Sequence, residues 1–342
     1  MTATTQTLDL EAVSAYLRGR LPGFDGPVEA RKFATGQSNP TFLLLTQAGN
    51  YVLRRKPPGV LLKSAHAIDR EFRVQRALAG SAVPVARMHL LCEDESVLGS
   101  DFYVMEHIAG RSFLDPSLPE ASPEERAAIT DEMNRVLAAL HDVDAETVDL
   151  ADYGPPGDYF QRQLSRWTGQ YRASETGSIP EMEELIAALE RERAPQDGQR
   201  GLVHGDFRID NMIFAADGPS CRALLDWELS TIGHPYADLA AVIMQWRMPP
   251  GPEGRGLAGL ERAALGLPED AAFIDAYCRR RGLPGVDQFG YCLGFSFFRM
   301  AAILQGVRKR ALDGAASNPE QALRLGTYVP EFARQGLQAL SE

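Results

Sequence analysis

The segment from Leu202 to Glu228 places three polar residues, Asp206, Asn211 and Asp226, among apolar runs. Between the last two, an Asp-Gly pair at 217 and 218 lies between two short apolar runs, 212–214 and 223–225. Such a pair is a strong signal for a β-hairpin. Because a hairpin brings the start of its first strand beside the end of its second, the sequence predicts that Asn211 and Asp226 lie side by side. Asp206 then lies on the loop that leads into the hairpin.

These three side chains suit one kind of chemistry. A carboxylate and an amide oxygen are hard ligands of the type that Mg²⁺ prefers, with waters and substrate phosphates as the remainder. Asp206, left free of the metal, can orient and deprotonate a hydroxyl. This division of labour is the one that phosphoryl transfer needs. The alternative is structural: a polar turn at 206–210 that caps a helix, and a carboxylate that ends a strand.

The pattern H-G-D-x-x-x-x-N, with L-D-W-E around a carboxylate 15 residues after the Asn, resembles the aminoglycoside phosphotransferase and choline kinase family. The resemblance implies an α+β, protein-kinase-like bilobal fold with ATP and Mg as cofactors. It makes Asp206 the catalytic base and makes Asn211 and Asp226 the magnesium ligands. We expect a small antiparallel-sheet lobe at 1–105 that covers the nucleotide, and a large, mainly helical lobe at 106–342 that carries catalysis and the acceptor.

Composition limits the classes of partner. With 342 residues, 44% hydrophobic and 24% charged, the chain is expected to be an ordinary globular protein of one large or two closely packed domains. A formal charge of −11 argues against a nucleic-acid partner, which requires a basic surface. Four scattered cysteines, no visible secretory signal and no long apolar run predict a cytoplasmic protein without a membrane partner. A homodimer stays an open alternative.

The first strands carry a candidate phosphate loop. Residues 28–33 and 41–46 are expected to be strands, and between them lie Gly36, Gln37, Ser38 and Asn39. In kinase-like folds the loop at this place covers the ATP phosphates with backbone N–H groups. A plain hairpin turn is the competing interpretation of one glycine with polar neighbours.

The next strand ends in three cations, Arg54, Arg55 and Lys56, before a pair of prolines. Kinases place a lysine here to hold the α and β phosphates, and strand alternation makes Arg54 its counterpart. Arginine keeps the charge and can bind two phosphate oxygens at once. Which of Arg54, Arg55 and Lys56 holds the phosphates stays open, and a solvated charge run is the alternative. The helix expected at 67–79 offers Glu71 as the ion-pair partner of Arg54, with local pairing to its arginine neighbours as the competing interpretation.

After an apolar strand at 102–105, the character changes to a connector that we interpret as the lobe hinge. The resemblance implies that the adenine of ATP pairs with backbone groups around Glu106, His107 and Ile108. Helix signals then dominate, with a capping box at Ser122, a second capping pair at Ser178 and Glu181, and helices at 271–281, 288–310 and 320–340.

The acceptor is expected against the late helices. They include Arg299, Arg308, Lys309 and Arg310, and Arg299 stands inside an otherwise apolar helix. The run YVLRRKPPG and the run LLDWELSTIGHPYADLA also resemble the kinase-like domains related to those fused to acyl-CoA dehydrogenases. That resemblance implies a small hydroxylated acyl substrate, or its CoA thioester, with Arg299 on the substrate. The alternative for these cations is a solvated helix end.

The predicted function is therefore that of an ATP- and Mg-dependent phosphotransferase acting on an alcohol group of a small molecule. Three alternatives stay open. A pseudokinase-like module would bind nucleotide or an acyl ligand without turnover. An aminoglycoside kinase would surround a polycation with carboxylates. A metal-dependent hydrolase using His204 would need further His or carboxylate ligands at short spacing, and six histidines show no such cluster.

Overall fold

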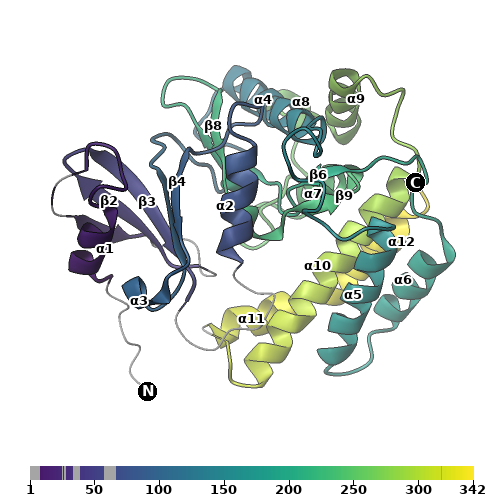
Figure 1. The fold of residues 1–342 in the computed structure, drawn as a ribbon. Helices are drawn as coiled ribbons and strands as arrows, with labels where there is room; N and C mark the ends of the chain where they lie inside the picture. The colour runs from purple at the N-terminus through teal and green to yellow at the C-terminus, as the bar shows by residue number, and fades with distance from the viewer. Residues whose placement is uncertain (1–7, 25, 27, 34–38, 58–66, 317) are drawn as a thin grey trace. The chain divides into compact units, whose positions relative to one another are not determined.

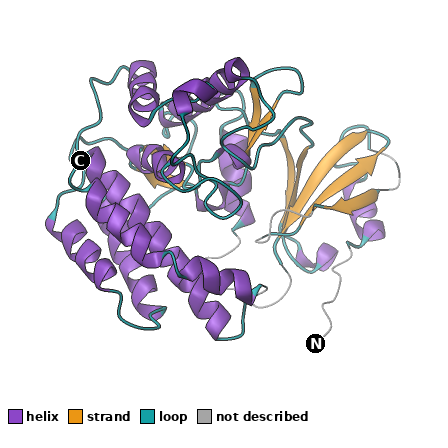
Figure 2. Cartoon of the chain, turned by 180° about the vertical axis from the view of Figure 1, so that it is seen from behind, coloured by secondary structure: helices purple, strands orange, loops and turns teal. Residues whose placement is uncertain are grey.

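The computed structural model describes residues 8–24, 26, 28–33, 39–57, 67–316 and 318–342. These residues form two compact units (Figures 1 and 2). Unit 1 is Met1–Arg111 with Asn211–Ser230, and unit 2 is Ser112–Asp210 with Thr231–Glu342. The hairpin segment that carries Asp226 therefore belongs to unit 1, and Asp206 belongs to unit 2. The lobe boundary that we place between 105 and 106 stays a prediction.

An antiparallel sheet of five strands organises the described part of unit 1 (Figure 2). The strands are β1 (Glu29–Lys32), β2 (Thr41–Thr46), β3 (Gly49–Arg55), β4 (Met88–Cys92) and β5 (Phe102–Glu106), in the spatial order β1-β2-β3-β5-β4. β3 lies between β2 and β5, so that its residues are paired on both sides. This central position fixes the direction of the Arg54 side chain.

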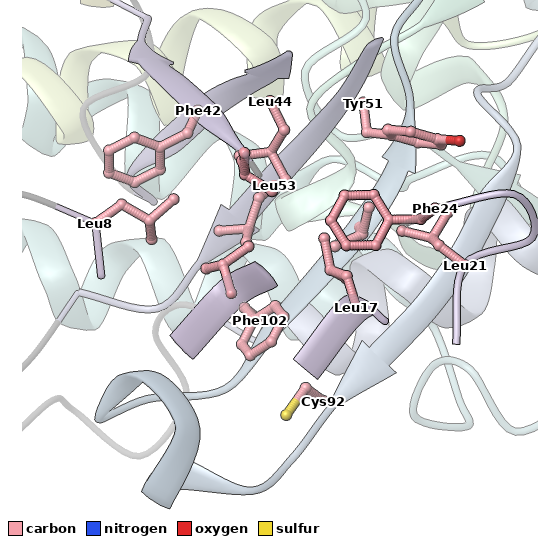
Figure 3. Packing of buried hydrophobic residues seen from close by; sticks show 13 residues of the cluster. Leu8, Leu17, Leu21, Phe24, Phe42, Leu44, Tyr51, Leu53, Cys92 and Phe102 are labelled. Carbon is pink, nitrogen blue, oxygen red and sulfur yellow. The ribbon is translucent and has the colours of Figure 1, made fainter. Parts of the chain in front are cut away.

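One face of the sheet is covered by α1 (Leu10–Leu17), whose N-terminus is capped by the Asp9 carboxylate. Leu17 of α1 is fully buried and packs with sheet residues such as Leu53 and Phe102 (Figure 3). Burying a leucine or phenylalanine side chain contributes about 1.5–3 kcal/mol. The hydrophobic core between α1 and the sheet therefore holds β3 in place.

Of the residues predicted to take part in the chemistry, Glu71 lies on α2 (Ile68–Ala77), and Asn211 and Asp226 flank the β7–β8 hairpin of unit 1. Ile68 and Phe72 of α2 pack with Tyr103 of β5. In the hairpin, β7 (Met212–Phe214) pairs antiparallel with β8 (Cys221–Leu224). Short helices at α3 (Glu95–Leu98) and η2 (Trp227–Leu229) complete the described part of this unit.

Unit 2 is mainly helical. Its elements are α4 (Pro123–His141), α5 (Tyr159–Ala173), α6 (Pro180–Arg191), β6 (Gly201–Val203), β9 (Thr231–Gly233), α7 (Tyr236–Trp246), α8 (Arg262–Leu265), α9 (Asp270–Arg281), α10 (Phe289–Leu312), α11 (Pro319–Gly326) and α12 (Val329–Ala339); the 3₁₀ turn Ile209–Asn211 links this unit to β7. The long helix α10 packs against α5, α6, α7, α11 and α12. Two short strands, β6 and β9, pair antiparallel at the base of the loop that carries Asp206.

The structure confirms the α+β class and the N-cap at Ser122, whose hydroxyl accepts from the Glu125 amide. Two expectations are wrong. The capping pair at Ser178 and Glu181 does not form, because α6 begins one residue later, with Ile179 at the cap position and no side-chain hydrogen bond. The single helix expected at 320–340 is broken into α11 and α12. Pro330 stands in the first turn of α12, where its missing N–H does no harm, whereas it would interrupt a continuous helix.

Among the described residues, no helix is both long enough and apolar enough to cross a membrane.

Candidate active site

In unit 1, the hairpin positions the two predicted magnesium ligands. Met212 pairs with Leu224 in the ladder, and the Leu225 amide donates to the Asn211 carbonyl at 2.7 Å. Asp226 follows directly, with φ 63° and ψ 64°. This left-handed conformation is uncommon for a residue with a side chain, but Asp and Asn tolerate it best. The backbone turn there ends the ladder and starts the η2 turn.

The hairpin is tied to the connector that follows β5. Arg111 and Phe214 exchange two backbone hydrogen bonds of 2.8 Å, and the Arg111 guanidinium donates to the Ala215 and Gly218 carbonyls. A Cβ atom at Gly110 would lie 2.2 Å from the Phe214 carbonyl oxygen, so this close approach requires glycine. The role of Arg111 was not predicted from the sequence; the available signal is an arginine directly after Gly110 in the connector that follows β5.

Arg54 lies at the centre of a network of charges in unit 1. Its Nε atom is 3.0 Å from Glu71 Oε2, and its Nη2 atom is 2.8 Å from Asp226 Oδ1 and 3.7 Å from Glu228 Oε2. The ion pair between Arg54 and Glu71 that the resemblance implies is therefore present. Arg55 points to the other side of β3, where it is buried, and Lys56 pairs with Asp101.

Glu71 is 1% exposed and is held by three side chains. Besides the Arg54 contact, Oε1 accepts from Asn39 Nδ2 at 2.9 Å and Oε2 accepts from the Tyr103 hydroxyl at 3.0 Å. Burial raises the pKa of Glu71 to about 7, against the opposing charge of Arg54. The Arg54 guanidinium has its pKa raised, because the carboxylates of Glu71, Asp226 and Glu228 outweigh its burial.

The donor set on the hairpin fits Mg²⁺. Asn211 and Asp226 supply an amide and a carboxylate oxygen, and the carboxylates of Asp226 and Glu228 are 35% and 27% exposed. Among the described residues no three His, Cys, Asp or Glu side chains gather to hold a metal ion. A site with so few protein ligands suits Mg²⁺, which keeps waters and takes substrate phosphate oxygens.

In unit 2, the loop that carries Asp206 is anchored by a buried carboxylate. Asp238 is 1% exposed and accepts from the backbone amides of His204 at 2.6 Å and Gly205 at 2.8 Å. The buried His204 ring accepts from the Asp206 amide at 3.2 Å and so supports the loop. The Asp206 carboxylate itself is 36% exposed and lies 3.2 Å from Arg208. The fold thus fixes the backbone of Asp206 and leaves its carboxylate accessible.

Behind Asp238 runs a chain of hydrogen bonds that the sequence did not reveal. His141 Nε2 lies 3.3 Å from the Asp238 carboxylate, and its Nδ1 lies 2.7 Å from the Tyr277 hydroxyl. Arg281 donates to the same hydroxyl at 2.8 Å. Since Arg281 can only donate, the hydroxyl is free to donate to Nδ1, and a neutral His141 then donates from Nε2 to Asp238. Burial lowers the pKa of His141, which agrees with the neutral ring.

The pKa of Asp238 reflects the same contacts. Burial alone would raise it, but the His141 hydrogen bond, the nearby histidines and the His204 amide hold it below its ordinary value. Asp238 therefore stays ionised and keeps its hydrogen bonds to both backbone amides of the loop.

Arg299 of α10 also contacts this loop. Its Nη2 atom donates to the Gly205 carbonyl at 2.8 Å, and its guanidinium lies 5.5 Å from the centre of the Trp167 ring. Of the other late cations, Arg308 lies against Gly326 of α11, and Lys309 pairs with Asp313 at 2.5 Å. Arg310 is exposed.

The other residues predicted to contact the nucleotide lie in the segment before β2 and at the end of β5. Gly36, Gln37 and Ser38 lie outside the described residues. Glu106 ends β5, and its backbone amide donates to the Arg87 carbonyl at 2.9 Å, so this amide is not available to adenine.

His107 and Ile108 follow Glu106 as half-buried residues in a loop. The Glu106 carbonyl and the backbone groups of His107 and Ile108 therefore stay the predicted contacts of adenine.

Residues 29–289 match the model of a family described as the phosphotransferase enzyme family. The chain is 46% identical over 333 residues to acyl-CoA dehydrogenase family member 10 of Mus musculus. That match covers 96% of this chain and 31% of the mouse protein, so the chain spans less than a third of its length.

Solved structures share the whole fold. A protein from Ralstonia eutropha, assigned provisionally as an aminoglycoside phosphotransferase, is 48% identical with a TM-score of 0.90 and covers 98% of this chain and 99% of its own. A thermostable mutant of aminoglycoside phosphotransferase APH(4)-Ia, in a ternary complex with AMP-PNP and hygromycin B, is 16% identical with a TM-score of 0.63. That likeness covers 96% of this chain and 98% of the other. The predicted protein-kinase-like α+β fold is confirmed.

Proposed function

This chain belongs to the phosphotransferase enzyme family, and we propose that it transfers the γ-phosphoryl group of ATP, with Mg²⁺, to a hydroxyl of a small molecule. The observation that carries the proposal is the anchoring of the Asp206 loop. Asp238 fixes the backbone before Asp206 through two short hydrogen bonds, while the Asp206 carboxylate stays accessible. A fixed backbone with an accessible carboxylate is the arrangement a positioned general base requires.

Each residue has a defined task in this proposal. Asp206 accepts the proton of the acceptor hydroxyl. The hydroxyl oxygen forms a bond to the γ-phosphorus while the bond from the γ-phosphorus to the leaving oxygen of ADP breaks. Asn211 and Asp226 would hold Mg²⁺, which supplies positive charge to the phosphate oxygens. Arg54, held by Glu71, has an Nη2 atom that can exchange its contact with Asp226 for a phosphate oxygen.

The acceptor that we propose is a hydroxylated acyl compound, as the free acid or its CoA thioester. The relative from Mus musculus that shares 46% identity is named for acyl-CoA dehydrogenase, which supports an acyl substrate. Arg299 supports it independently, because a cation beside the Asp206 loop suits an anionic or carbonyl-bearing acceptor better than a polycation. Since the four cysteines are buried and free, we also propose the cytoplasm as the compartment.

The experiment is an ATP-consumption screen with purified protein and Mg²⁺. Hydroxyacyl-CoAs, free hydroxy acids, choline-like alcohols and aminoglycosides are compared, and ³¹P NMR identifies the phosphorylated product. We expect consumption with the first two classes. Consumption with aminoglycosides alone would overturn the acyl acceptor. No consumption with any alcohol would overturn the kinase and favour a module that binds without turnover.

The binding-module alternative has one observation in its favour, namely the contact of Arg54 with Asp226, which occupies a predicted metal ligand. Calorimetry with Mg-ATP distinguishes the two. A kinase binds Mg-ATP and consumes it with an acceptor, whereas a binding module shows the first property alone.

A further inference from the structure

The loop that follows α7 in unit 2, at residues 247–256, has a defined conformation although it is rich in proline and glycine. The Gly256 amide donates to the Pro249 carbonyl at 3.0 Å, which closes the loop on itself. A Cβ atom at Gly256 would lie 1.9 Å from the Met248 carbonyl oxygen, so the two ends of the loop pack closely. The loop therefore holds its side chains at defined places.

Two residues from the end of the chain also hold this loop. Arg324 Nε, on α11, lies 2.6 Å from Glu253 Oε1. The Tyr328 hydroxyl, just before α12, donates to Glu253 Oε2 at 3.1 Å. Glu253 is thereby fixed two residues before Arg255, and all of these residues belong to unit 2.

Arg255 itself has a strained backbone. Its φ angle is 48°, in the left-handed region that a residue with a long side chain seldom adopts. Such a conformation costs on the order of 1–3 kcal/mol, persists only where the surroundings impose it, and is frequent near functional sites. The strained residue is also the one whose side chain reaches the Asp206 loop.

Arg255 contacts that loop at Asp210, in the 3₁₀ turn Ile209–Asn211. Arg255 Nη1 donates to Asp210 Oδ2 at 3.0 Å, and Arg208 Nη2 lies 3.3 Å from the same oxygen. The Asp210 side chain is only 7% exposed, so water screens these charges less than it would at the surface. One carboxylate oxygen thus joins two arginines from separate parts of unit 2.

Arg208 extends this connection to the predicted base. Its Nε atom lies 3.2 Å from Asp206 Oδ1, while its Nη2 atom is at Asp210. A guanidinium group is planar and its nitrogens have a fixed geometry, so a group held at Nη2 has its Nε in a fixed place as well. The contact restricts rotation of the Asp206 carboxylate, which is 36% exposed.

We propose that Arg255 is a positioning residue for phosphoryl transfer. Through Asp210 it holds the Arg208 guanidinium in place. Arg208 in turn orients the carboxylate of Asp206, so the inference rests on the proposed function, in which this carboxylate is the general base. Asp238 fixes the backbone of the same loop, whereas Arg255 acts on the side chain of the base.

The first test uses variants of Arg255. Arg255→Met removes the charge and keeps an unbranched side chain at the strained position, and Arg255→Lys keeps the charge. Because the Arg255 side chain is 42% exposed, its ion pair adds little to stability, so both variants should fold, which thermal unfolding verifies. Arg247→Met is the matched control, since Arg247 belongs to the same loop but pairs with Asp270 and Glu342.

ADP release from Mg-ATP is measured with a hydroxyacyl-CoA and with the free hydroxy acid as acceptors. We expect Arg255→Met to lower kcat by about 10-fold, within the roughly 10²-fold that misplacement of a reacting group can cost. The KM for ATP should change by less than about 2-fold, because the lost interaction serves the chemical step. Arg255→Lys should restore most of kcat, and Arg247→Met should match the wild type.

A double variant shows whether Arg255 acts through Arg208. Arg208→Met should lower kcat by itself. In that background, Arg255→Met should change kcat by less than about 2-fold, because residues that act as one unit are not additive. A purely structural effect of Arg255 would instead lower kcat equally in both backgrounds.

The second test needs no turnover. The protein is labelled with ¹⁵N-arginine, and the Nε–H signal of Arg208 is identified by its loss in Arg208→Met. A guanidinium held on both sides exchanges its Nε–H slowly with water, so the wild type should show the signal. Arg255→Met should lose it through faster exchange, while Arg255→Lys and Arg247→Met should keep it.

Three results would overturn the inference: an unchanged kcat in Arg255→Met, an equal loss of kcat with and without Arg208, or an Arg208 signal that Arg255→Met does not alter. The proposed function fails separately, when the Arg208 signal responds as expected but the wild type consumes no ATP with any acceptor. That result would also overturn the catalytic role of Arg255, and the contact alone would be left.

Discussion

The Arg54 guanidinium joins two carboxylates of different character: its Nε lies 3.0 Å from the buried Glu71, and its Nη2 lies 2.8 Å from the half-exposed Asp226. Lysine has a single ammonium nitrogen and cannot contact both carboxylates with the same geometry. The side chain of Arg54 is 11% exposed and that of Glu71 is 1% exposed. The pair is therefore a buried ion pair, in which each charge depends on the other.

The first prediction concerns this dependence. Arg54→Met should destabilise the protein by about 3–5 kcal/mol, because it leaves Glu71 buried without its cation. In the double variant Arg54→Met with Glu71→Gln the buried charge is gone, so much of that stability should return. Chemical unfolding of the wild type, both single variants and the double variant gives the coupling energy. Additive effects of the two substitutions would contradict the buried-pair interpretation.

The second prediction concerns Asp226 as a magnesium ligand. Asp226 has a left-handed backbone, so Asp226→Asn is a better test than alanine, since asparagine tolerates this conformation. We expect the Mg²⁺-dependent part of ATP affinity to fall by at least about 10-fold, because even residues that only support a metal ligand cost this much when removed. Calorimetry with and without Mg²⁺ gives the value. Asp217→Asn, in the hairpin turn, is the control, and an unchanged magnesium dependence in Asp226→Asn would refute the assignment.

The third prediction concerns Asp206 as the base. Asp206→Asn keeps the shape of the side chain and does not disturb the Asp238 hydrogen bonds, which involve the amides of His204 and Gly205. Turnover should fall by roughly 10²-fold or more, the scale of general-base catalysis, while Mg-ATP affinity stays within several-fold. Single-turnover kinetics with a saturating acceptor measure the chemical step. Near-normal turnover would mean that Asp206 only positions the loop.

Much of unit 1 could be predicted because its signals are local. Strand alternation distinguished Arg54 from Arg55, and the structure places Arg55 on the other side of β3, away from Glu71. The Asp-Gly pair identified the β7–β8 hairpin, although β8 ends at Leu224 rather than at 225. In the first case the signal is the two-residue alternation of a strand, and in the second it is the residue pair in the turn. Both signals lie within a few consecutive residues.

The contacts that support the Asp206 loop could not be predicted from local sequence signals. Strands β6 and β9 have three residues each, which is too short for a periodic pattern, and their pairing is set by distant parts of the chain. His141, Tyr277 and Arg281 come from α4 and α9, and only tertiary packing brings them behind Asp238. The available signal was His141 itself, a polar residue that continues an apolar stripe of α4.

The hydrogen-bond chain behind Asp238 gives the last prediction, which concerns pH. A neutral His141 accepts from Tyr277 and donates to Asp238, whereas a protonated ring has no lone pair for the Tyr277 hydroxyl. Burial lowers the pKa of His141 below its ordinary value of 6.5. The unfolded chain therefore binds this proton more readily than the folded protein. The stability that depends on the neutral ring is complete above pH 6.5 and is lost as the pH falls below it.

His141→Gln isolates this contribution, because a glutamine amide can donate to Asp238 and accept from Tyr277 at any pH. Between pH 6.5 and the lowered pKa, the wild type should lose about 1.4 kcal/mol of unfolding free energy per pH unit more than the variant does. Chemical unfolding of both proteins at pH 8, 7, 6 and 5 gives the difference, from which the other titrating groups cancel. Turnover of the variant at pH 8 should stay close to that of the wild type, since the two backbone hydrogen bonds to Asp238 are kept. Parallel stability curves for the two proteins would show that His141 does not hold Asp238 as a neutral donor.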